Sequence, residues 1–476
     1  MRQPQSHLGG RWVAGNGRVE TLLNPATEEP LAEVSSEGLD RNAALEFART
    51  RGGPALRSMS FAARGAMLRA MCEGIQAHRE ELIELAVANG GNTRSDAKFD
   101  IDGATFTLSA YAELGKTLGE SRILVDGDGV QLGRTPRFHG QHIRVPRHGV
   151  ALHINAFNFP AWGLAEKAAV ALLAGMPVLA KPATSSALVA HRIVEILVGK
   201  NALPEGALSL LLGGAGDVLA HVGPQDVVAF TGSSTTGALI RALPAVIRNS
   251  VRVNVEADSL NAAVLGPDAE PGSESCDYFL KDVLRDMTQK AGQKCTAIRR
   301  VLVPQPFAER VRDELVDKLG AVVVGNPATD GVRMGPVATA QQHRDVREGI
   351  DALARDGRLV YGNGALKPIG APDGKGYFVS PVLLEVEPGA AAPTVHSREV
   401  FGPVATLVPY SGRADEAAAI VSRGQGGLVS SVYSEDVAFT SDVVLGLAPF
   451  HGRVFLGSVK IAEQSPGPGT VLPALV

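Results

Sequence analysis

Between residues 150 and 257 the sequence alternates strictly between short apolar runs and stretches with helical spacing. Each run is too short for a helix and ends in polar residues, as a buried strand does. Strands that alternate with helices form crossover units, which build a parallel sheet with helices on both faces. We therefore predict an α/β domain of the nucleotide-binding type. Its strands are VALHINA, PVLAKPA, LSLLLG, DVVAFTG and VRVNVEA, separated by helices over 161–174, 185–198, 217–222 and 234–243.

A second alternating set follows a polar link over residues 266–275, which contains proline and glycine. A helix over 279–292 and the apolar run RRVLVP over 299–304 begin this set. The chain length of 476 residues also suits more than one domain. The predicted fold class is therefore α/β, with two Rossmann-like parallel-sheet domains.

Two further segments precede the first sheet. Met67, Met71 and Ile75 have helical spacing, and the pattern stops at the Gly90–Gly91 pair, so the N-terminal part is helix-rich. From 121 to 149 polar and apolar residues alternate, with glycine and proline interruptions. This pattern predicts an extended hairpin that stands away from the main body as an arm.

Charge and cysteine content exclude several classes of function. The chain carries 46 Lys and Arg against 50 Asp and Glu, a net charge of −4, so we expect no nucleic-acid partner and no basic membrane patch. Its longest apolar stretch, 168–180, is broken by Gly175 and Pro177 and is too short to span a membrane. The three cysteines form no CxxC pair or metal-ligand cluster. We expect a cytoplasmic protein without a metal site, whose partners are small molecules or copies of itself.

Cys295 lies in AGQKCTAIRR, between a predicted helix and a predicted strand. A thiol on such a connection can face a cleft between domains, and Lys294, Arg299 and Arg300 favour its thiolate if their charges point inward. The alternative is a small buried side chain, which describes most lone cysteines. Before its context is considered, this alternative is the stronger of the two.

Polar residues at the strand ends of the first domain indicate a ligand site. Ligands of open α/β sheets bind outside the carboxyl ends of the strands, and Asn158, Lys181, Ser233 and Glu256 all follow such ends. Glu256 suits a general base, and FTGSSTTG suits an anion such as a pyrophosphate at a helix start. Taken singly, each has an ordinary explanation as a solvated end residue or a capped turn. Their convergence favours a site.

Six motifs share one order along the chain. They are NAFNFPAWG with Asn158, LAKPAT with Lys181, FTGSSTTG, VNVEADSLN with Glu256, GQKCTA with Cys295, and EVFGPV over 399–404. In this order and at these separations they resemble the aldehyde dehydrogenase superfamily over about residues 10 to 460. The segments NAFNFP, NVEADSLN and SGRADEA, together with GQKCTAIRR, resemble those of a narrower branch of this superfamily. This branch is the dehydrogenases of aerobic CoA-dependent aromatic degradation. This branch includes semialdehyde dehydrogenases of the benzoate pathway and a domain of the phenylacetate ring-opening fusion protein.

The resemblance implies a mechanism with an aldehyde as substrate. The thiolate of Cys295 would attack the aldehyde carbon, while the side-chain amide of Asn158 and the backbone N–H of Cys295 hold the alkoxide. After hydride transfer to a nicotinamide, Glu256 would activate the water that hydrolyses the thioester to an acid. Relatives that pass the acyl group to CoA generally lack this carboxylate, so Glu256 favours hydrolysis.

The resemblance also assigns cofactor contacts and indicates NADP. Relatives that strictly prefer NAD often carry a glutamate at the position of Thr184, which bonds the adenosine 2′-hydroxyl and would repel a 2′-phosphate. Thr184 removes that repulsion, so we expect NADP, with NAD as a second cofactor. The expected cofactor-binding residues are Phe157, Lys181, Thr184, Phe230, Gly232, Ser233, Glu399 and Phe401.

By the same resemblance, residues 1–120 and 150–257 form the cofactor-binding domain, 121–149 an oligomerisation arm, and 258–445 the catalytic domain. Residues 446–476 are expected to return to the cofactor domain and the arm, and to end early, because relatives continue past the stretch that matches PALV. A homodimer is expected unless the shortened C-terminus prevents it.

Two other classes of function stay open. A cysteine acyl-hydrolase could use Cys295, Asn158 and Glu256 without a cofactor, but it leaves FTGSSTTG, Thr184 and EVFGPV unexplained. A non-catalytic role is open if the shortened end prevents assembly. For the substrate, the branch implies a CoA-linked semialdehyde, and free medium-chain aldehydes are the alternative.

Overall fold

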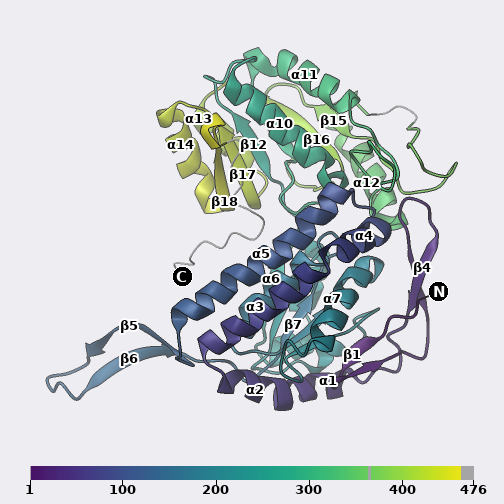
Figure 1. Ribbon diagram of the computed structural model, residues 1–476. Coiled ribbons are helices and arrows are strands. Elements are labelled where there is room, and N and C mark those ends of the chain that lie inside the picture. The colour runs from purple at the N-terminus through teal and green to yellow at the C-terminus, as the bar shows by residue number, and fades with distance from the viewer. Residues whose placement is uncertain (1, 363–365, 462–476) are drawn as a thin grey trace.

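The first domain is built on a seven-stranded sheet in the order β11-β10-β7-β8-β9-β1-β2. The computed structural model describes residues 2–362 and 366–461, and it places this domain below the second domain in the view of Figure 1. Strands β7 to β11 pair in parallel, which confirms the predicted crossover units, and β1 and β2 extend the sheet antiparallel. The strands are β1 (Ser6–Leu8), β2 (Arg11–Val13), β7 (Ala151–Ile154), β8 (Val178–Lys181), β9 (Leu208–Leu210), β10 (Val227–Thr231) and β11 (Arg252–Glu256).

The helices between these strands follow the prediction closely, with one exception. The segment predicted as a helix over 217–222 forms only the 3-10 turn η3 (Val218–His221). Gly216 stands before it and Pro224 after it, which leaves no room for a longer helix. The others are α6 (Trp162–Leu173), η2 (Thr184–Ser186), α7 (Ala187–Gly199), α8 (Ser234–Arg241) and α9 (Pro244–Arg248).

The N-terminal part is helical, as predicted, and packs on the first sheet. Leu68 of α3, Leu108 of α5 and Leu172 of α6 lie in one core cluster without solvent exposure. Each such side chain contributes about 2 kcal/mol when fully buried. Gly91 ends α4 with a left-handed φ of 65°. The elements are β3 (Glu20–Leu23), β4 (Pro30–Val34), α1 (Arg41–Phe47), η1 (Ala48–Gly52), α2 (Gly53–Ser58), α3 (Phe61–Ala77), α4 (Arg79–Gly90) and α5 (Arg94–Leu118).

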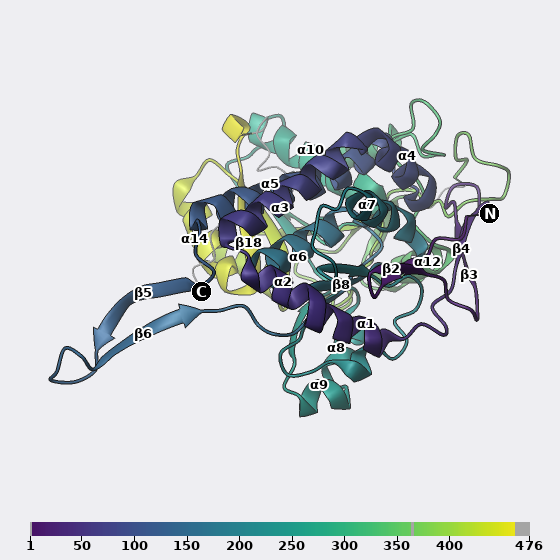
Figure 2. The same cartoon turned by 60° about the horizontal axis from the view of Figure 1, so that its bottom comes forward.

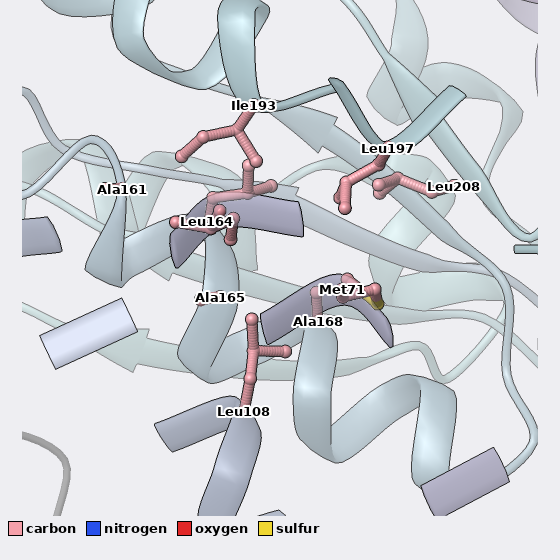
Figure 3. A pocket seen from close by; sticks show the side chains of 10 residues that line it. Met71, Leu108, Ala161, Leu164, Ala165, Ala168, Ile193, Leu197 and Leu208 are labelled. Carbon is pink, nitrogen blue, oxygen red and sulfur yellow. The ribbon is translucent and has the colours of Figure 1, made fainter. Parts of the chain in front are cut away.

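A small void lies inside this helical core. Its volume is about 10 Å³, and Figure 3 shows that aliphatic side chains such as Met71, Leu108 and Leu164 surround it. This volume is at the lower limit for one water molecule, and water also needs polar partners, which the apolar lining does not offer. The void is therefore a dry packing defect and not a ligand site.

The predicted arm is an antiparallel hairpin of β5 (Leu124–Gln131) and β6 (His139–Arg144). It projects from the body, as Figure 2 shows. Val125, Val130 and Phe138 on this hairpin expose more than half of their surface. The hairpin therefore presents apolar surface to the outside.

The second domain contains a seven-stranded sheet in the order β14-β15-β16-β13-β12-β17-β18. All neighbours pair in parallel except β14 with β15. This confirms a second α/β unit. Its strands are β12 (Ala262–Leu265), β13 (Arg300–Pro304), β14 (Arg358–Tyr361), β15 (Val382–Glu385), β16 (Val404–Tyr410), β17 (Gly427–Tyr433) and β18 (His451–Gly457). Its helices are α10 (Glu274–Thr288), η4 (Gln289–Gly292), η5 (Gln305–Phe307), α11 (Ala308–Gly320), α12 (Ala340–Leu353), α13 (Ala414–Ser422), α14 (Val437–Leu447), η6 (Ala448–Phe450) and η7 (Val459–Ile461).

Two sequence predictions need correction in this domain. Its first strand is β12, which precedes the polar link over 266–275, so the link lies inside the domain. Residues 451–457 pair with β17 in the second sheet and do not return to the first domain as expected. The remaining part of that expectation, over 462–476, lies outside the described residues.

Candidate active site

Cys295 lies on the connection between η4 and β13. Lys290 and Ala291 approach it in left-handed backbone conformations, with φ of 54° and 51°. Such conformations cost a non-glycine residue about 1 to 3 kcal/mol and concentrate at functional sites. On the other side, the side-chain amide of Asn261 donates to the Cys295 carbonyl oxygen at 2.8 Å. The thiol therefore stands on a fixed turn.

The carboxylate of Glu256, the last residue of β11, lies close to the thiol of Cys295, and each group shifts the pKa of the other. Burial raises the pKa of both groups, and the nearby carboxylate of Glu166 raises them further. The thiol is therefore protonated at rest, with a carboxylate of increased basicity beside it. This is the arrangement of a nucleophile next to a general base.

The basic residues around Cys295 do not point toward it. Lys294 donates to Asp286 at 2.7 Å, Arg299 binds Glu399, and Arg300 donates to the carbonyl oxygen of Leu260 at 2.6 Å. These charges would favour the thiolate only if they pointed toward the sulfur, and they do not. The thiol is therefore activated by proton transfer to Glu256 and not by neighbouring cations.

Asn158 is buried beside the same turn. Its side-chain amide donates to the carbonyl oxygen of Gln293 at 3.0 Å, two positions before Cys295. Among the hydrogen bonds of the described residues, none uses the backbone N–H of Cys295. One amide hydrogen of Asn158 and this N–H are available to an oxygen atom at the reacting carbon. Both donors of the expected oxyanion hole are thus present at the nucleophile.

The turn that carries Asn158 is fixed by the start of α6. Asp100 of α5 accepts from the backbone N–H of Trp162 at 2.8 Å and of Ala161 at 3.2 Å. A carboxylate at a helix N-terminus satisfies N–H groups that the helix leaves without partners. Asp100 therefore anchors the segment that presents Asn158.

Glu399 and Phe401 are connected to the thiol turn through Arg299, which binds both Glu399 and the carbonyl oxygen of Gly292. The carboxylate of Glu399 accepts from Arg299 at 3.1 Å and from the backbone N–H of Ser259 at 3.0 Å. Phe401 meets Phe157 of the first domain edge to face, with ring centroids 5.9 Å apart. Three expected cofactor contacts from two domains therefore come together.

The FTGSSTTG segment forms the turn from β10 into α8. Ser233 caps α8 by accepting from the backbone N–H of Thr236 at 3.3 Å. A β-carbon at Gly232 would lie 2.5 Å from the ring of Phe230, so a larger residue here would displace that ring. The carboxylate of Asp258 accepts from the N–H and the hydroxyl of Ser234, at 3.3 and 2.5 Å. The expected anion site therefore has an acidic neighbour that the sequence did not reveal.

Residues 12–449 match the aldehyde dehydrogenase family. The chain belongs to this family. It is 48% identical to the 3,4-dehydroadipyl-CoA semialdehyde dehydrogenase of Aromatoleum evansii over 98% of this chain and 91% of that protein. Solved structures agree in fold. A betaine aldehyde dehydrogenase of Staphylococcus aureus bound to NAD+ is 24% identical, with a TM-score of 0.82 over 95% of this chain and 89% of that one. A 3,6-anhydro-L-galactose dehydrogenase is 22% identical, with a TM-score of 0.84 over 96% and 91%.

Aldehyde dehydrogenases use a nicotinamide dinucleotide, and the first domain has polar groups suited to one. Thr231 and Asn155, at the carboxyl ends of β10 and β7, each have a buried side-chain oxygen without a hydrogen-bond partner among the described residues. Strand pairing aligns Ile154 with Lys181 and Thr231 with Glu256, so these ends share one edge of the sheet. Unsatisfied polar atoms at this edge fit a ligand with many hydrogen-bonding groups.

Lys181 ends β8 and Thr184 follows it, three strands along the sheet from β11, which carries Glu256. Burial lowers the pKa of Lys181, and the carboxylate of Glu20 opposes this shift. Thr184 begins η2. Glu20 belongs to the N-terminal strand β3 and was not among the expected site residues. Its carboxylate is close enough to Lys181 to act on the pKa of that side chain.

Sequence reasoning also missed the pair Glu166 and Lys167 on α6. The two side chains are 2.8 Å apart, and both act on the pKa of Glu256, which Lys167 lowers and Glu166 raises. Adjacent opposite charges on a helix usually indicate a face exposed to solvent, so the Glu–Lys pair did not by itself indicate a functional site. The only available sign was their position within two turns of NAFNFPAWG.

The described residues contain no group of three metal-ligating side chains. No helix among them is long and apolar enough to cross a membrane.

Proposed function

We propose that this aldehyde dehydrogenase oxidises an aldehyde to a carboxylic acid through a thioester on Cys295, which is hydrolysed with the help of Glu256. The single observation that carries this proposal is that the carboxylate of Glu256 and the amide of Asn158 both lie at the thiol turn of Cys295. A nucleophile, a base and oxyanion donors brought together at one site are what acyl chemistry requires.

Glu256 would first take the thiol proton, and the sulfur of Cys295 would form a bond to the aldehyde carbon. The resulting alkoxide would accept hydrogen bonds from Asn158 and from the backbone N–H of Cys295. A bound nicotinamide supplies the acceptor for the hydride of that carbon, which leaves the thioester.

Glu256 would next release the thiol proton to solvent, which restores its carboxylate, and would then take a proton from water as the water oxygen attacks the thioester carbon. The carbon–sulfur bond breaks, the acid leaves, and the sulfur of Cys295 recovers its proton from Glu256. Because burial raises the pKa of Glu256, its carboxylate is a stronger base than an exposed glutamate.

We propose NADP as the preferred cofactor, with NAD as a second. Thr184 carries no charge that would repel a 2′-phosphate, and Lys181 offers an ammonium nearby. Glu20 acts in the opposite direction, since its carboxylate lies near Lys181. Glu20→Gln is expected to lower the KM for NADP more than that for NAD.

For the substrate we propose a CoA-linked semialdehyde of the 3,4-dehydroadipyl type. The similarity to the Aromatoleum evansii enzyme supports this, at 48% identity over nearly the whole chain. Free medium-chain aldehydes are the alternative substrate. We also propose cytoplasmic action, in keeping with the three free cysteines, and a homodimer that uses the hairpin of β5 and β6.

Absorbance of the reduced nicotinamide tests these proposals directly. The purified chain is incubated with NAD or NADP and with a CoA-linked semialdehyde or a free medium-chain aldehyde. We expect turnover that depends on both cofactor and aldehyde, higher with NADP and with the CoA-linked substrate. No turnover with any pair refutes the proposed function, and ester hydrolysis alone would favour the acyl-hydrolase.

A further inference from the structure

We propose that Arg299 is a positioning residue that sets the cofactor-contacting loop over 399–402 against the turn that carries Cys295. This inference rests on the proposed function, because it concerns the geometry of hydride transfer. Arg299 is 5% exposed and lies just before β13, so it is part of the interior of the site.

The guanidinium of Arg299 bonds to both segments at once. Toward the nucleophile turn it donates to the carbonyl oxygens of Gly292 at 2.9 Å and Lys294 at 3.2 Å. Toward the cofactor loop it donates to Gly402 at 2.8 Å and to the carboxylate of Glu399 at 3.1 and 3.2 Å. No other side chain among the described residues forms hydrogen bonds to both segments.

The two segments also touch directly at their backbones. A β-carbon at Gly292 would lie 2.1 Å from the carbonyl oxygen of Gly402, so only glycine permits this approach. The guanidinium carbon of Arg299 lies 5.5 Å from the ring centroid of Phe401. Arg299 thus fixes both the carboxylate and the aromatic ring that are expected to contact the nicotinamide half of the cofactor.

Arginine suits this role because its donors are held in a rigid, planar fork. Lysine offers a compact ammonium that cannot reach carbonyl groups on one side and a carboxylate on the other in fixed geometry. Arg299→Lys therefore keeps the charge that Glu399 needs but loses the link between the segments. Glu399 and the Cys295 turn are then free to shift relative to each other.

The test separates hydride transfer from nucleophilic chemistry. Hydrolysis of an activated ester such as p-nitrophenyl acetate needs the groups around Cys295 and no hydride acceptor. Aldehyde oxidation needs the distance between Cys295 and the nicotinamide as well. We expect Arg299→Lys to lower kcat for aldehyde oxidation on the order of a hundredfold, as a displacement of about 1 Å does, and to leave ester hydrolysis within about threefold.

A kinetic isotope effect with aldehyde deuterated at the carbonyl carbon gives a second measure. If Arg299 sets the transfer distance, the isotope effect on kcat should rise in Arg299→Lys, because hydride transfer becomes rate-limiting. Arg300→Lys is the matched control. Arg300 is also buried, at the start of β13, but it donates to the carbonyl oxygens of Leu260, Ile420 and Val421 and forms no hydrogen bond with Glu399.

Each outcome decides between positioning and simple stability. Equal losses of oxidation and ester hydrolysis in Arg299→Lys, or the same pattern in Arg300→Lys, would overturn the proposal. Unchanged oxidation in a folded Arg299→Lys protein would overturn it too. A wild-type chain that hydrolyses the ester but oxidises no aldehyde would instead refute the proposed function itself.

Discussion

Two carboxylates flank Cys295, and their surroundings differ. Glu399, from the second domain, is held at both oxygens, by the guanidinium of Arg299 and by the backbone N–H of Ser259. Glu256, from the first domain, lies beside the thiol and forms no salt bridge among the described residues, although the charge of Lys167 acts on it. Burial raises the pKa of both, but at Glu399 the charge of Arg299 opposes that shift at close range.

The difference separates binding from proton transfer. A carboxylate pinned by an arginine keeps one position and one charge, which suits a hydrogen-bond acceptor for a ligand. A carboxylate that is buried without such a partner exchanges protons more readily near neutral pH. The two domains therefore contribute chemically different carboxylates to one nucleophile.

Removal of the nucleophile should have the largest effect. Cys295→Ala takes away the group that Glu256 contacts, and we expect aldehyde oxidation and ester hydrolysis to fall by about 10⁴-fold or more. Steady-state assays of both reactions check this. Cys276→Ala is the control, because Cys276 is fully buried in the second-domain core and should retain activity. Substantial oxidation by Cys295→Ala would rule out the thioester route.

Loss of the unpaired carboxylate should stall deacylation. Glu256→Gln is expected to give a rapid burst of reduced cofactor followed by turnover about 10²- to 10⁴-fold slower, because water is no longer activated. Stopped-flow absorbance separates the two phases. Glu399→Gln should show no burst and a raised KM for the cofactor. The same burst in both variants would contradict the assignment of proton transfer to Glu256 and of cofactor binding to Glu399.

The pH profile offers a companion measurement. Glu256 must be ionised to act as a base, and burial raises its pKa, so kcat should rise with pH over a range above about 4.3, the value for a free glutamate. The rise should be missing in Glu256→Gln. An acidic limb that persists unchanged in that variant would assign the titration to another group.

The free energy of unfolding should fall more in Glu399→Gln than in Glu256→Gln. Glu399→Gln leaves Arg299 buried without its counter-charge, which is expected to cost about 3 kcal/mol in the free energy of unfolding. Glu256→Gln removes a charge that burial already disfavours, so its stability should change by less than about 1 kcal/mol. Denaturant unfolding followed by fluorescence measures both. Similar losses in the two variants would show that Arg299 does not distinguish them.

The smallest expected effect concerns Asp258. Its exposed carboxylate binds Ser234 at the start of α8, where a cofactor pyrophosphate is expected. Asp258→Asn should therefore lower the cofactor KM by about two- to fivefold, and added salt should shrink the difference by screening. Asp268→Asn, at an exposed site that binds Ser434, is the control. A raised KM in Asp258→Asn would mean that the carboxylate supports the cofactor.

Local sequence patterns predicted the strands of the first domain, because a strand depends on a short stretch of chain. Strands β7, β8, β10 and β11 follow the apolar runs, and parallel pairing aligns Thr231 with Glu256 as expected. The short strand β12 was missed because AAVL stands beside a polar link and has no helix before it.

The features of the site that were missed depend on contacts between residues far apart in the sequence. Arg299 and Glu399 are 100 positions apart, and only the folded chain makes Arg299 a partner of Glu399 and not of Cys295. The sequence placed these arginines near the thiol correctly, but side-chain direction is set by packing. Asp258 at the start of α8 and Glu20 near Lys181 escaped for the same reason.

The projecting hairpin of β5 and β6 has a thermodynamic consequence. In the single chain Val125, Val130 and Phe138 bury little of their apolar surface. Folding of the hairpin therefore gains little hydrophobic stabilisation in the single chain. Any association that covers it binds only the folded form and shifts the folding equilibrium by mass action. Dilution should then lower the melting temperature, which makes thermal stability a property of protein concentration as well as of sequence.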